Sequence, residues 1–112
     1  MSTETQLVAY VQESEFDTVL TESEEKVVVV DFTATWCGPC RLVSPLMDQL
    51  AQEYKGRAKV VKVDVDSNKP IFKKFGLRSI PAVLIFKDGN LEETIVGVSP
   101  YEDFSNAVLK LL

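Results

Sequence analysis

The two cysteines of the chain lie in one short segment, residues 36–40, where Gly38 and Pro39 separate them. Side chains at positions i and i+3 of a first helical turn share one face, so the sulfurs of Cys37 and Cys40 can form a disulfide. A disulfide that closes so short a loop stabilises a fold by only about 2 kcal/mol before strain is subtracted, and longer loops give more. The spacing therefore favours a reversible dithiol/disulfide centre over a structural disulfide.

The two cysteines are expected to have different roles. A helix that begins at about Cys37 leaves its first N–H groups unpaired and directs the positive end of its dipole at the first sulfur, which favours a thiolate. Cys37 is therefore the predicted nucleophile. Cys40 lies one turn further into the helix, where we expect a less exposed sulfur that resolves a mixed disulfide by intramolecular attack. Gly38 and Pro39 complete the predicted redox motif, and a first helical turn needs no N–H donor at Pro39.

A Cys-x-x-Cys pair is also found in metal sites. Tetrahedral zinc takes four ligands, usually Cys and His, and this chain has two Cys and no His. A zinc site within one chain would need carboxylates to complete it. A dimer that shares four thiolates, or an iron–sulfur cluster that bridges two chains, is the alternative to a redox centre. We expect neither a metal nor a bound cofactor.

Ahead of the cysteines, residues 27–32 form a continuous apolar run that contains one carboxylate, Asp31. A β-branched run of this kind predicts a central strand covered on both faces, where an unpaired carboxylate is rare. Burial raises the pKa of a carboxyl group, and a raised pKa would let Asp31 accept and return protons near neutral pH. We therefore predict that Asp31 takes part in proton transfer.

The elements that position these residues follow from hydrophobic periodicity and turn residues. The strand, helix and strand around the redox segment form a βαβ unit with parallel strands, and the turn at Asp88 and Gly89 predicts an antiparallel hairpin. The expected strands are 7–11, 27–32, 58–65, 82–87 and 91–96, and the expected helices are 14–20, 37–55, 68–75 and one that begins near 99. The predicted fold class is α/β, with a mixed five-stranded sheet flanked by about four helices.

The long helix after the redox segment carries a periodic apolar stripe. Leu42, Leu46, Leu50 and Tyr54 recur every four residues and are predicted to face the core. Pro45 lies inside this helix and is expected to kink it, because proline lacks an N–H group and its ring clashes with the preceding turn.

The ends of two other helices are predicted from capping residues. Ser14 and Asp17 would form a capping box at the first helix. Ser99 is the expected N-cap of the last helix, with Pro100 in its first turn and Glu102 as the acid of its capping box.

Length and composition are typical of one compact domain, which we expect to span residues 1–112, because 46% of the residues are apolar. The net charge of −5 is spread without long blocks of like charge, which argues against binding to nucleic acids or anionic membranes. The chain starts without the basic and apolar regions of a signal peptide. We expect a soluble cytoplasmic monomer, and a mature organellar form is the open alternative.

Residues 30–41, with the sequence VDFTATWCGPCR, resemble the active-site stretch of the thioredoxin family. KVDVD at 62–66, IPA at 80–82 and VG at 96–97 follow in the order and at about the spacings that the family shows. The resemblance covers nearly the whole chain. The sequence departs from the family pattern at Thr33, where many thioredoxins have a second tryptophan, and this difference concerns packing and fluorescence more than mechanism.

The resemblance implies a thioredoxin fold and a general protein-disulfide reductase, which passes two electrons by thiol–disulfide exchange. It implies that Cys37 attacks, that Cys40 resolves, and that Asp31 deprotonates Cys40 directly or through water. Lys62 would approach and tune the buried aspartate, and a solvated strand lysine explains the sequence equally well. The implied partners are disulfide-containing client proteins and a thioredoxin reductase of the NADPH-flavin or ferredoxin-dependent type. A protein that binds partners regardless of its redox state is the alternative of another class.

The resemblance also implies a surface on which partners dock. Pro81 follows Ile80 at the start of an apolar strand, where proline is tolerated. Thioredoxins place a cis proline beside the dithiol, so a cis bond is expected here although most X–Pro bonds are trans. Trp36, Ile80, Pro81 and Gly97 would form the apolar docking face. Core packing of Ile80 and turn geometry at Gly97 are the alternatives.

Overall fold

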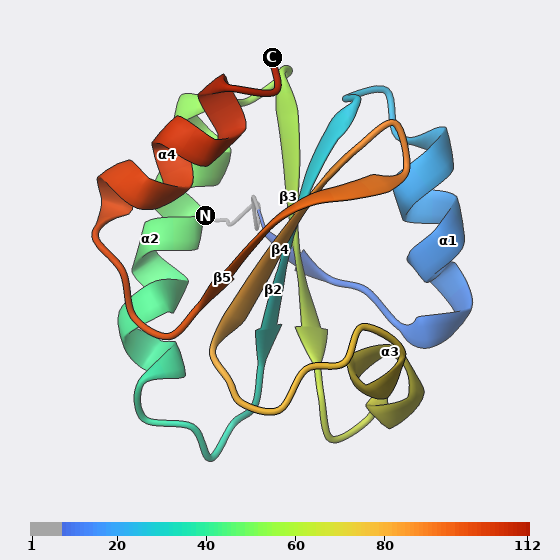
Figure 1. Ribbon diagram of the computed structural model, residues 1–112, viewed down its shortest axis with the longest axis vertical. Helices are drawn as coiled ribbons and strands as arrows, with labels where there is room; N and C mark the ends of the chain where they lie inside the picture. Colours follow the sequence, from blue (N-terminus) through green and yellow to red (C-terminus); the bar gives the residue numbers. More distant parts are fainter. Residues whose placement is uncertain (1–7) are drawn as a thin grey trace, which may run out of the picture.

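The computed structural model of the chain describes residues 8–112. Its strands are β1 (Ala9–Tyr10), β2 (Val27–Thr33), β3 (Ala58–Asp64), β4 (Ala82–Lys87) and β5 (Asn90–Val96). Its helices are α1 (Glu13–Glu22), α2 (Cys40–Glu53), α3 (Lys69–Lys74) and α4 (Tyr101–Leu109). The predicted first strand began at Leu7, which lies outside the described residues, and β1 is only two residues long. The helices α2 and α4 cover one face of the sheet, and α1 and α3 cover the other (Figure 1).

The strands form one mixed sheet of five strands in the order β1-β3-β2-β4-β5. β3 is parallel to both β1 and β2, whereas β4 is antiparallel to both β2 and β5. The predicted mixed sheet and the parallel βαβ unit are confirmed. The predicted hairpin is also confirmed, since Asp88 and Gly89 have φ values of 51° and 83° and form the two-residue turn between β4 and β5.

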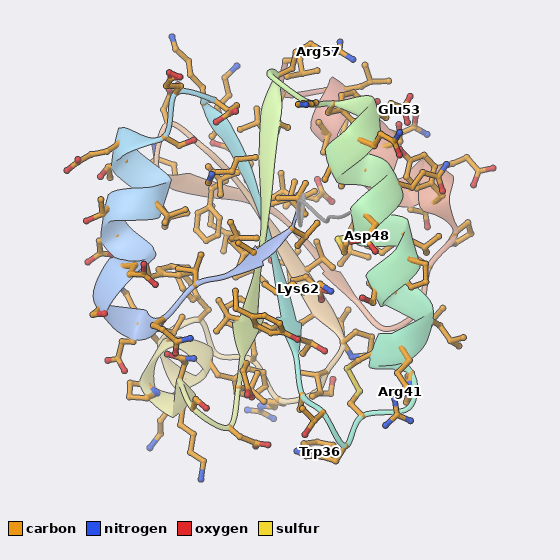
Figure 2. All side chains as sticks on the ribbon, turned by 180° about the vertical axis from the view of Figure 1, so that it is seen from behind. Trp36, Arg41, Asp48, Glu53, Arg57 and Lys62 are labelled. Carbon is orange, nitrogen blue, oxygen red and sulfur yellow. A yellow bond between two sulfur atoms is a disulfide. The ribbon has the colours of Figure 1, made fainter. Side chains whose placement is uncertain are left out.

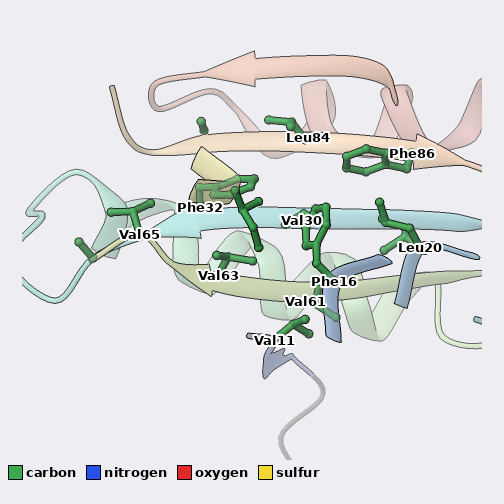
Figure 3. Close-up of a cluster of buried hydrophobic side chains, with 14 of the residues drawn as sticks. Val11, Phe16, Leu20, Val30, Phe32, Val61, Val63, Val65, Leu84 and Phe86 are labelled. Carbon is green, nitrogen blue, oxygen red and sulfur yellow. The ribbon is translucent and has the colours of Figure 1, made fainter. Parts of the chain in front are cut away.

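The central strand β2 sends alternate side chains into two hydrophobic clusters. Val30 and Phe32 belong to the cluster between the sheet and the helices α1 and α3, where Phe16 packs with them (Figure 3). Val29 belongs to the cluster beneath α2 and α4. Because successive side chains of a strand point to opposite faces, Asp31 follows Val29 and lies on the face that α2 and α4 cover.

The helix α2 begins later than the sequence predicted. It starts at Cys40 with Pro39 as its N-cap residue, so the predicted start near Cys37 is wrong. Gly38 and Pro39 form a turn instead, and Arg41 N–H donates to Gly38 O across it over 3.0 Å. The helix continues through Pro45 to Glu53. The first cysteine therefore precedes the helix, and the second is its first residue.

The buried face of α2 also differs from the predicted leucine stripe. Leu42 is 62% exposed, and Leu46 is only partly buried. An α-helix has about 3.6 residues per turn, so a series spaced by four residues drifts around the helix and leaves the core face. The buried residues follow a mixed spacing of three and four, and they are Cys40, Val43, Met47, Leu50, Ala51 and Tyr54.

The capping box predicted for α1, with Ser14 and Asp17, is wrong. The N-cap is Gln12, whose N–H donates to Glu15 Oε1 over 2.9 Å. The N–H of the first helical residue donates over 2.7 Å to Asn68 Oδ1, which lies 55 positions further along the chain. A partner this distant satisfies a first-turn amide, and local sequence does not reveal it.

The predicted start of α4 is wrong by one residue. Its N-cap is Pro100, without a side-chain cap, so Ser99 lies before the cap. Glu102 falls in the first turn, where a negative charge interacts favourably with the helix dipole. Between α4 and α2, the hydroxyl groups of Tyr54 and Ser105 lie 2.6 Å apart and share a hydrogen bond.

Candidate active site

The redox turn connects the end of β2 to the start of α2. Cys37 and Cys40 form a disulfide there, with their Cα atoms 5.3 Å apart. Trp36 and Arg41 lie on the two sides of this turn (Figure 2). The turn is closed by a hydrogen bond from Cys37 N–H to Ala34 O over 3.2 Å. The structure therefore brings together the two sulfurs that the sequence predicted to react.

Exposure does not distinguish the two cysteines in this disulfide form. Each residue is 3% exposed, so the burial of the whole residue does not separate the attacking from the resolving position. The difference lies in hydrogen bonding, because Cys40 N–H points at Cys37 Sγ over 3.2 Å. An N–H group at the start of a helix stabilises a thiolate on the sulfur it faces. This contact favours charge on the sulfur of Cys37.

Asp31 is a buried carboxyl group on the central strand β2. Its residue is 1% exposed, and neither carboxylate oxygen has a hydrogen-bond partner within residues 8–112. Burial raises the pKa of Asp31 from 3.8 to about 7, which confirms the predicted direction. The Lys62 cation opposes this rise, and the Asp48 carboxylate on α2 adds to it. Near pH 7, the neutral and the ionised forms of the Asp31 carboxyl group are therefore both populated.

Lys62 is the cross-strand neighbour of Asp31 in the parallel pairing of β2 with β3. Its Nζ donates a hydrogen bond over 2.7 Å to Ser44 Oγ on α2 and lies 5.8 Å from the centre of the Tyr10 ring. Lys62 and Asp48 are labelled on β3 and α2 in Figure 2. The ammonium is thus tied to α2 and acts on Asp31 through space. No pattern in the sequence pointed to Ser44.

Two of the predicted docking residues come together at the ends of β4 and β5. The peptide bond between Ile80 and Pro81 is cis. Gly97 has a φ of 90°, a conformation that favours glycine, and its N–H donates to Pro81 O over 2.8 Å. Ile80 is half-buried at the rim of the hydrophobic cluster that contains both cysteines. Turn geometry at Gly97 and core contact at Ile80 are therefore both present.

Trp36 projects from the loop before α2 and is 65% exposed (Figure 2). Its indole Nε1–H donates to Asp66 Oδ2 over 2.8 Å. Asp66 N–H in turn donates to Asp64 Oδ1 over 3.0 Å, which fixes the turn after β3. The indole is therefore held in place while its ring faces solvent. Sequence reasoning missed Asp66, since nothing local distinguishes it from the neighbouring acids.

Residues 8–112 contain neither a cluster of metal-binding side chains nor a membrane-spanning helix. The His, Cys, Asp and Glu side chains there form no group of three or more that could hold a metal ion. None of the helices in the same range is both long and apolar enough to cross a membrane.

The fold and the site together define a class of protein. A mixed sheet between two pairs of helices, with a Cys-x-x-Cys disulfide where β2 meets α2, is the arrangement of a dithiol/disulfide oxidoreductase. The family model described as Thioredoxin matches residues 7–110. The chain belongs to the thioredoxin family.

Individual relatives agree with this assignment. Thioredoxin 1 of Synechococcus elongatus is 48% identical over 85 residues, which are 76% of this chain and 79% of that protein. Thioredoxin 1 of Nostoc sp. is 43% identical over 104 residues, covering 93% and 96% of the two chains. The solved structure of a mutant thioredoxin from Halobacterium salinarum superposes with a TM-score of 0.83 at 33% identity, covering 98% of this chain and 96% of that one.

Family membership establishes the activity. Thioredoxins are protein-disulfide oxidoreductases, and the disulfide of Cys37 and Cys40 is the redox-active pair of this chain. The chain is a dithiol/disulfide electron carrier. Its partners are disulfide-containing client proteins and a reductase that restores the dithiol.

Proposed function

We propose that this protein is a general reductase of protein disulfides in which Cys37 attacks and Cys40 resolves. The hydrogen bond from Cys40 N–H to Cys37 Sγ carries this assignment, because it stabilises negative charge on the first sulfur. The position of Cys37 before the first residue of α2 supports it further, since the positive end of the helix dipole faces that side.

The exchange proceeds in two displacement steps. The thiolate of Cys37 attacks the client disulfide, forms a mixed disulfide and releases one client thiolate. The thiolate of Cys40 then attacks Cys37 Sγ, which breaks the mixed disulfide and releases the second client sulfur. The client gains two electrons and two protons, and the protein ends with the Cys37–Cys40 disulfide. The sulfurs carry the electrons, so the exchange itself needs no bound cofactor.

Asp31 is the proposed acceptor of the Cys40 proton, directly or through water. Its pKa of about 7 supports this role, because a general base works best when its pKa lies near the operating pH. Lys62 is the proposed tuning residue, since its charge lowers the pKa that burial raises. Trp36, Ile80, Pro81 and Gly97 are the proposed docking face for client proteins.

Several properties of the whole protein belong to the same proposal. The protein acts as a single domain over residues 1–112, as a monomer in the cytoplasm, without nucleic-acid or membrane partners. The mature form of an organellar protein is the alternative location. A reductase of the NADPH-flavin or the ferredoxin-dependent type restores the dithiol. Coupled assays with one purified reductase of each type identify which one reloads this chain.

Reduction of insulin by dithiothreitol tests the proposed function. We expect the wild-type protein to accelerate insulin precipitation over dithiothreitol alone and Cys37→Ser to abolish the acceleration. Wild-type protein without effect would contradict the reductase function. Binding of a client that persists unchanged in a variant without both cysteines would instead favour a role as an interaction subunit.

A further inference from the structure

A hollow of about 340 Å³ lies beside the redox turn. It is lined by Trp36, Val65, Phe72, Arg78, Ser79 and Ile80. Trp36 adjoins the attacking cysteine, and Ile80 precedes the cis proline. The hollow therefore continues the proposed docking face towards α3, where a client side chain next to the disulfide can enter.

The lining of this hollow is apolar except at one side. Trp36, Val65, Phe72 and Ile80 offer hydrocarbon and aromatic surface, and Arg78 is the only charged residue of the lining. Such a surface suits an apolar side chain, since burying it in contact with aromatic rings is favourable. The hollow therefore favours a client segment that combines an apolar side chain with a group able to pair with a guanidinium.

The segment that ends at Arg78 is basic although the whole chain is acidic. Residues 69–78 contain Lys69, Lys73, Lys74 and Arg78 and no Asp or Glu, whereas the net charge of the chain is −5. The four basic side chains of this segment attract acidic partners and repel basic ones, although Asp66 beside Trp36 and Glu13 and Asp17 beside Lys74 offset part of their charge. Because Arg78 is the charged residue of the lining, a carboxylate is the complementary group at the hollow itself.

Arg78 is available for such a contact. Its side chain is exposed, and within residues 8–112 its guanidinium has no hydrogen bond or ion pair. In contrast, Arg41 Nη2 donates to Thr35 O over 3.0 Å. Asp66, which contacts the lining at Trp36, accepts the indole N–H of that residue. A client carboxylate therefore finds an unengaged guanidinium on the rim of the hollow.

We propose that this hollow is a specificity subsite for disulfide clients that carry an acidic residue beside an apolar one near the reacting cysteine. The apolar side chain packs against Trp36, Phe72 and Ile80, and the carboxylate pairs with Arg78. The inference rests on the proposed docking function of Trp36 and Ile80. An Arg fork can hold a carboxylate with two parallel hydrogen bonds, which Lys cannot do.

A set of disulfide peptides tests the subsite. All peptides share one sequence, which has a leucine near the cysteine. In each peptide one position within three residues of the cysteine, on either side, is replaced by Glu, Gln or Lys. We expect wild-type kcat/KM to be about two- to five-fold higher for Glu than for Gln at one or more positions, as an exposed charge pair allows. Lys should fall below Gln, and 0.5 M salt should reduce the differences.

Two matched variants locate the effect. Arg78→Gln should remove the preference for Glu while reduction of the Gln peptide stays within about two-fold of wild type. Lys74→Gln is the control, because it makes the same change in net charge within the same segment. Lys74 Nζ lies 5.7 Å from the centre of the Phe75 ring, and Lys74 lines a different hollow with Glu13 and Asp17. We expect Lys74→Gln to keep the preference.

The outcomes separate this inference from the proposed function. Equal kcat/KM for all peptides with wild-type protein would overturn the subsite while leaving the reductase function intact. A preference that survives in Arg78→Gln, or that disappears equally in Lys74→Gln, would also overturn it. If wild-type protein reduced neither insulin nor any of the peptides, the reductase function itself would be overturned.

Discussion

Lys62 and Ser44 join the central sheet to α2 through a hydrogen bond of 2.7 Å between Nζ and Oγ. Lys62 lies opposite Asp31 in the pairing of β2 with β3, but its ammonium is engaged by Ser44. Both carboxylate oxygens of Asp31 are without a hydrogen-bond partner among residues 8–112. The pKa of Asp31 is therefore set by burial and by charges acting at a distance. Its sensitivity to those charges can be measured.

Replacing Lys62 by Met should raise the pKa of Asp31 above about 7, because Lys62 lowers it in the wild type. Replacing Asp48 by Asn should lower the same pKa, since the Asp48 carboxylate raises it. The second effect should be smaller, because Asp48 is exposed and water screens its charge. Titration of the Asp31 carboxyl carbon by NMR measures both changes. Shifts of the same sign in the two variants would contradict the electrostatic account.

Replacing Asp31 by Asn should increase stability most at alkaline pH. The folded protein keeps the Asp31 proton between pH 3.8 and about 7 while the unfolded chain has lost it, so wild-type stability falls as the pH rises through this range. The rise in pKa corresponds to about 4 kcal/mol once the carboxyl is ionised. The stability gain of Asp31→Asn should therefore grow from near zero at pH 4 to a few kcal/mol at pH 8. Urea unfolding of the oxidised proteins measures it.

The same variant should resolve mixed disulfides more slowly near pH 7, because the proposed proton acceptor for Cys40 is lost. The deficit should shrink at alkaline pH, where the thiol of Cys40 ionises without help. Rapid mixing of reduced protein with a disulfide peptide, at peptide concentrations where attack is no longer limiting, measures the rate of mixed-disulfide resolution at each pH. If Asp31→Asn were less stable than wild type and equally fast at every pH, Asp31 would be a structural residue and the proton-transfer role would be wrong.

The two cysteines should differ in covalent trapping. Cys40→Ser should form mixed disulfides with client proteins and fail to release them, because the resolving thiol is missing. Cys37→Ser should trap few clients. Non-reducing electrophoresis after incubation with an oxidised client distinguishes the two variants. More trapping by Cys37→Ser than by Cys40→Ser would reverse the assigned roles.

Trp36, the only tryptophan, should report the redox state through its fluorescence, since it adjoins Cys37. Identical spectra for oxidised and reduced wild type would mean that the indole does not sense the sulfurs.

The hydrogen bond to Asp66 should limit the motion of the Trp36 ring. Asp66→Ala removes the acceptor of the indole N–H and should increase the fast component of the fluorescence anisotropy decay. Glu92→Ala makes the same charge change on the exposed side of β5 and should leave the decay unchanged.

Local signals explain how much of this protein could be predicted from its sequence. The valine run of β2 and the turn at Asp88 and Gly89 fixed the central strand and the hairpin, because each depends on neighbouring residues. Asp31 was found for the same reason, since a single carboxylate in an apolar run is visible without knowledge of its surroundings. The strand pairing then followed from general rules for βαβ units and hairpins.

Contacts between distant positions explain what could not be predicted. Lys62 and Ser44 lie 18 positions apart, and Trp36 and Asp66 lie 30 apart, so no periodic pattern relates them. The start of α2 was misplaced because the dipeptide Gly38-Pro39 is compatible with a turn as well as with a first helical turn. The resemblance implied the proposed docking residues and said nothing of Arg78, because the role proposed for Arg78 depends on its position beside the hollow.

The hydrogen bond from Gly97 N–H to Pro81 O links the ends of β4 and β5 across 2.8 Å. The two chain segments that carry the proposed docking face are thereby joined to each other before any client binds. A client then meets a preorganised surface, and little conformational entropy is lost in arranging it. The Gly97 amide is already engaged, so it cannot donate to the backbone of a bound polypeptide. We therefore expect main-chain pairing with a client on the other side of the proline, at Ile80.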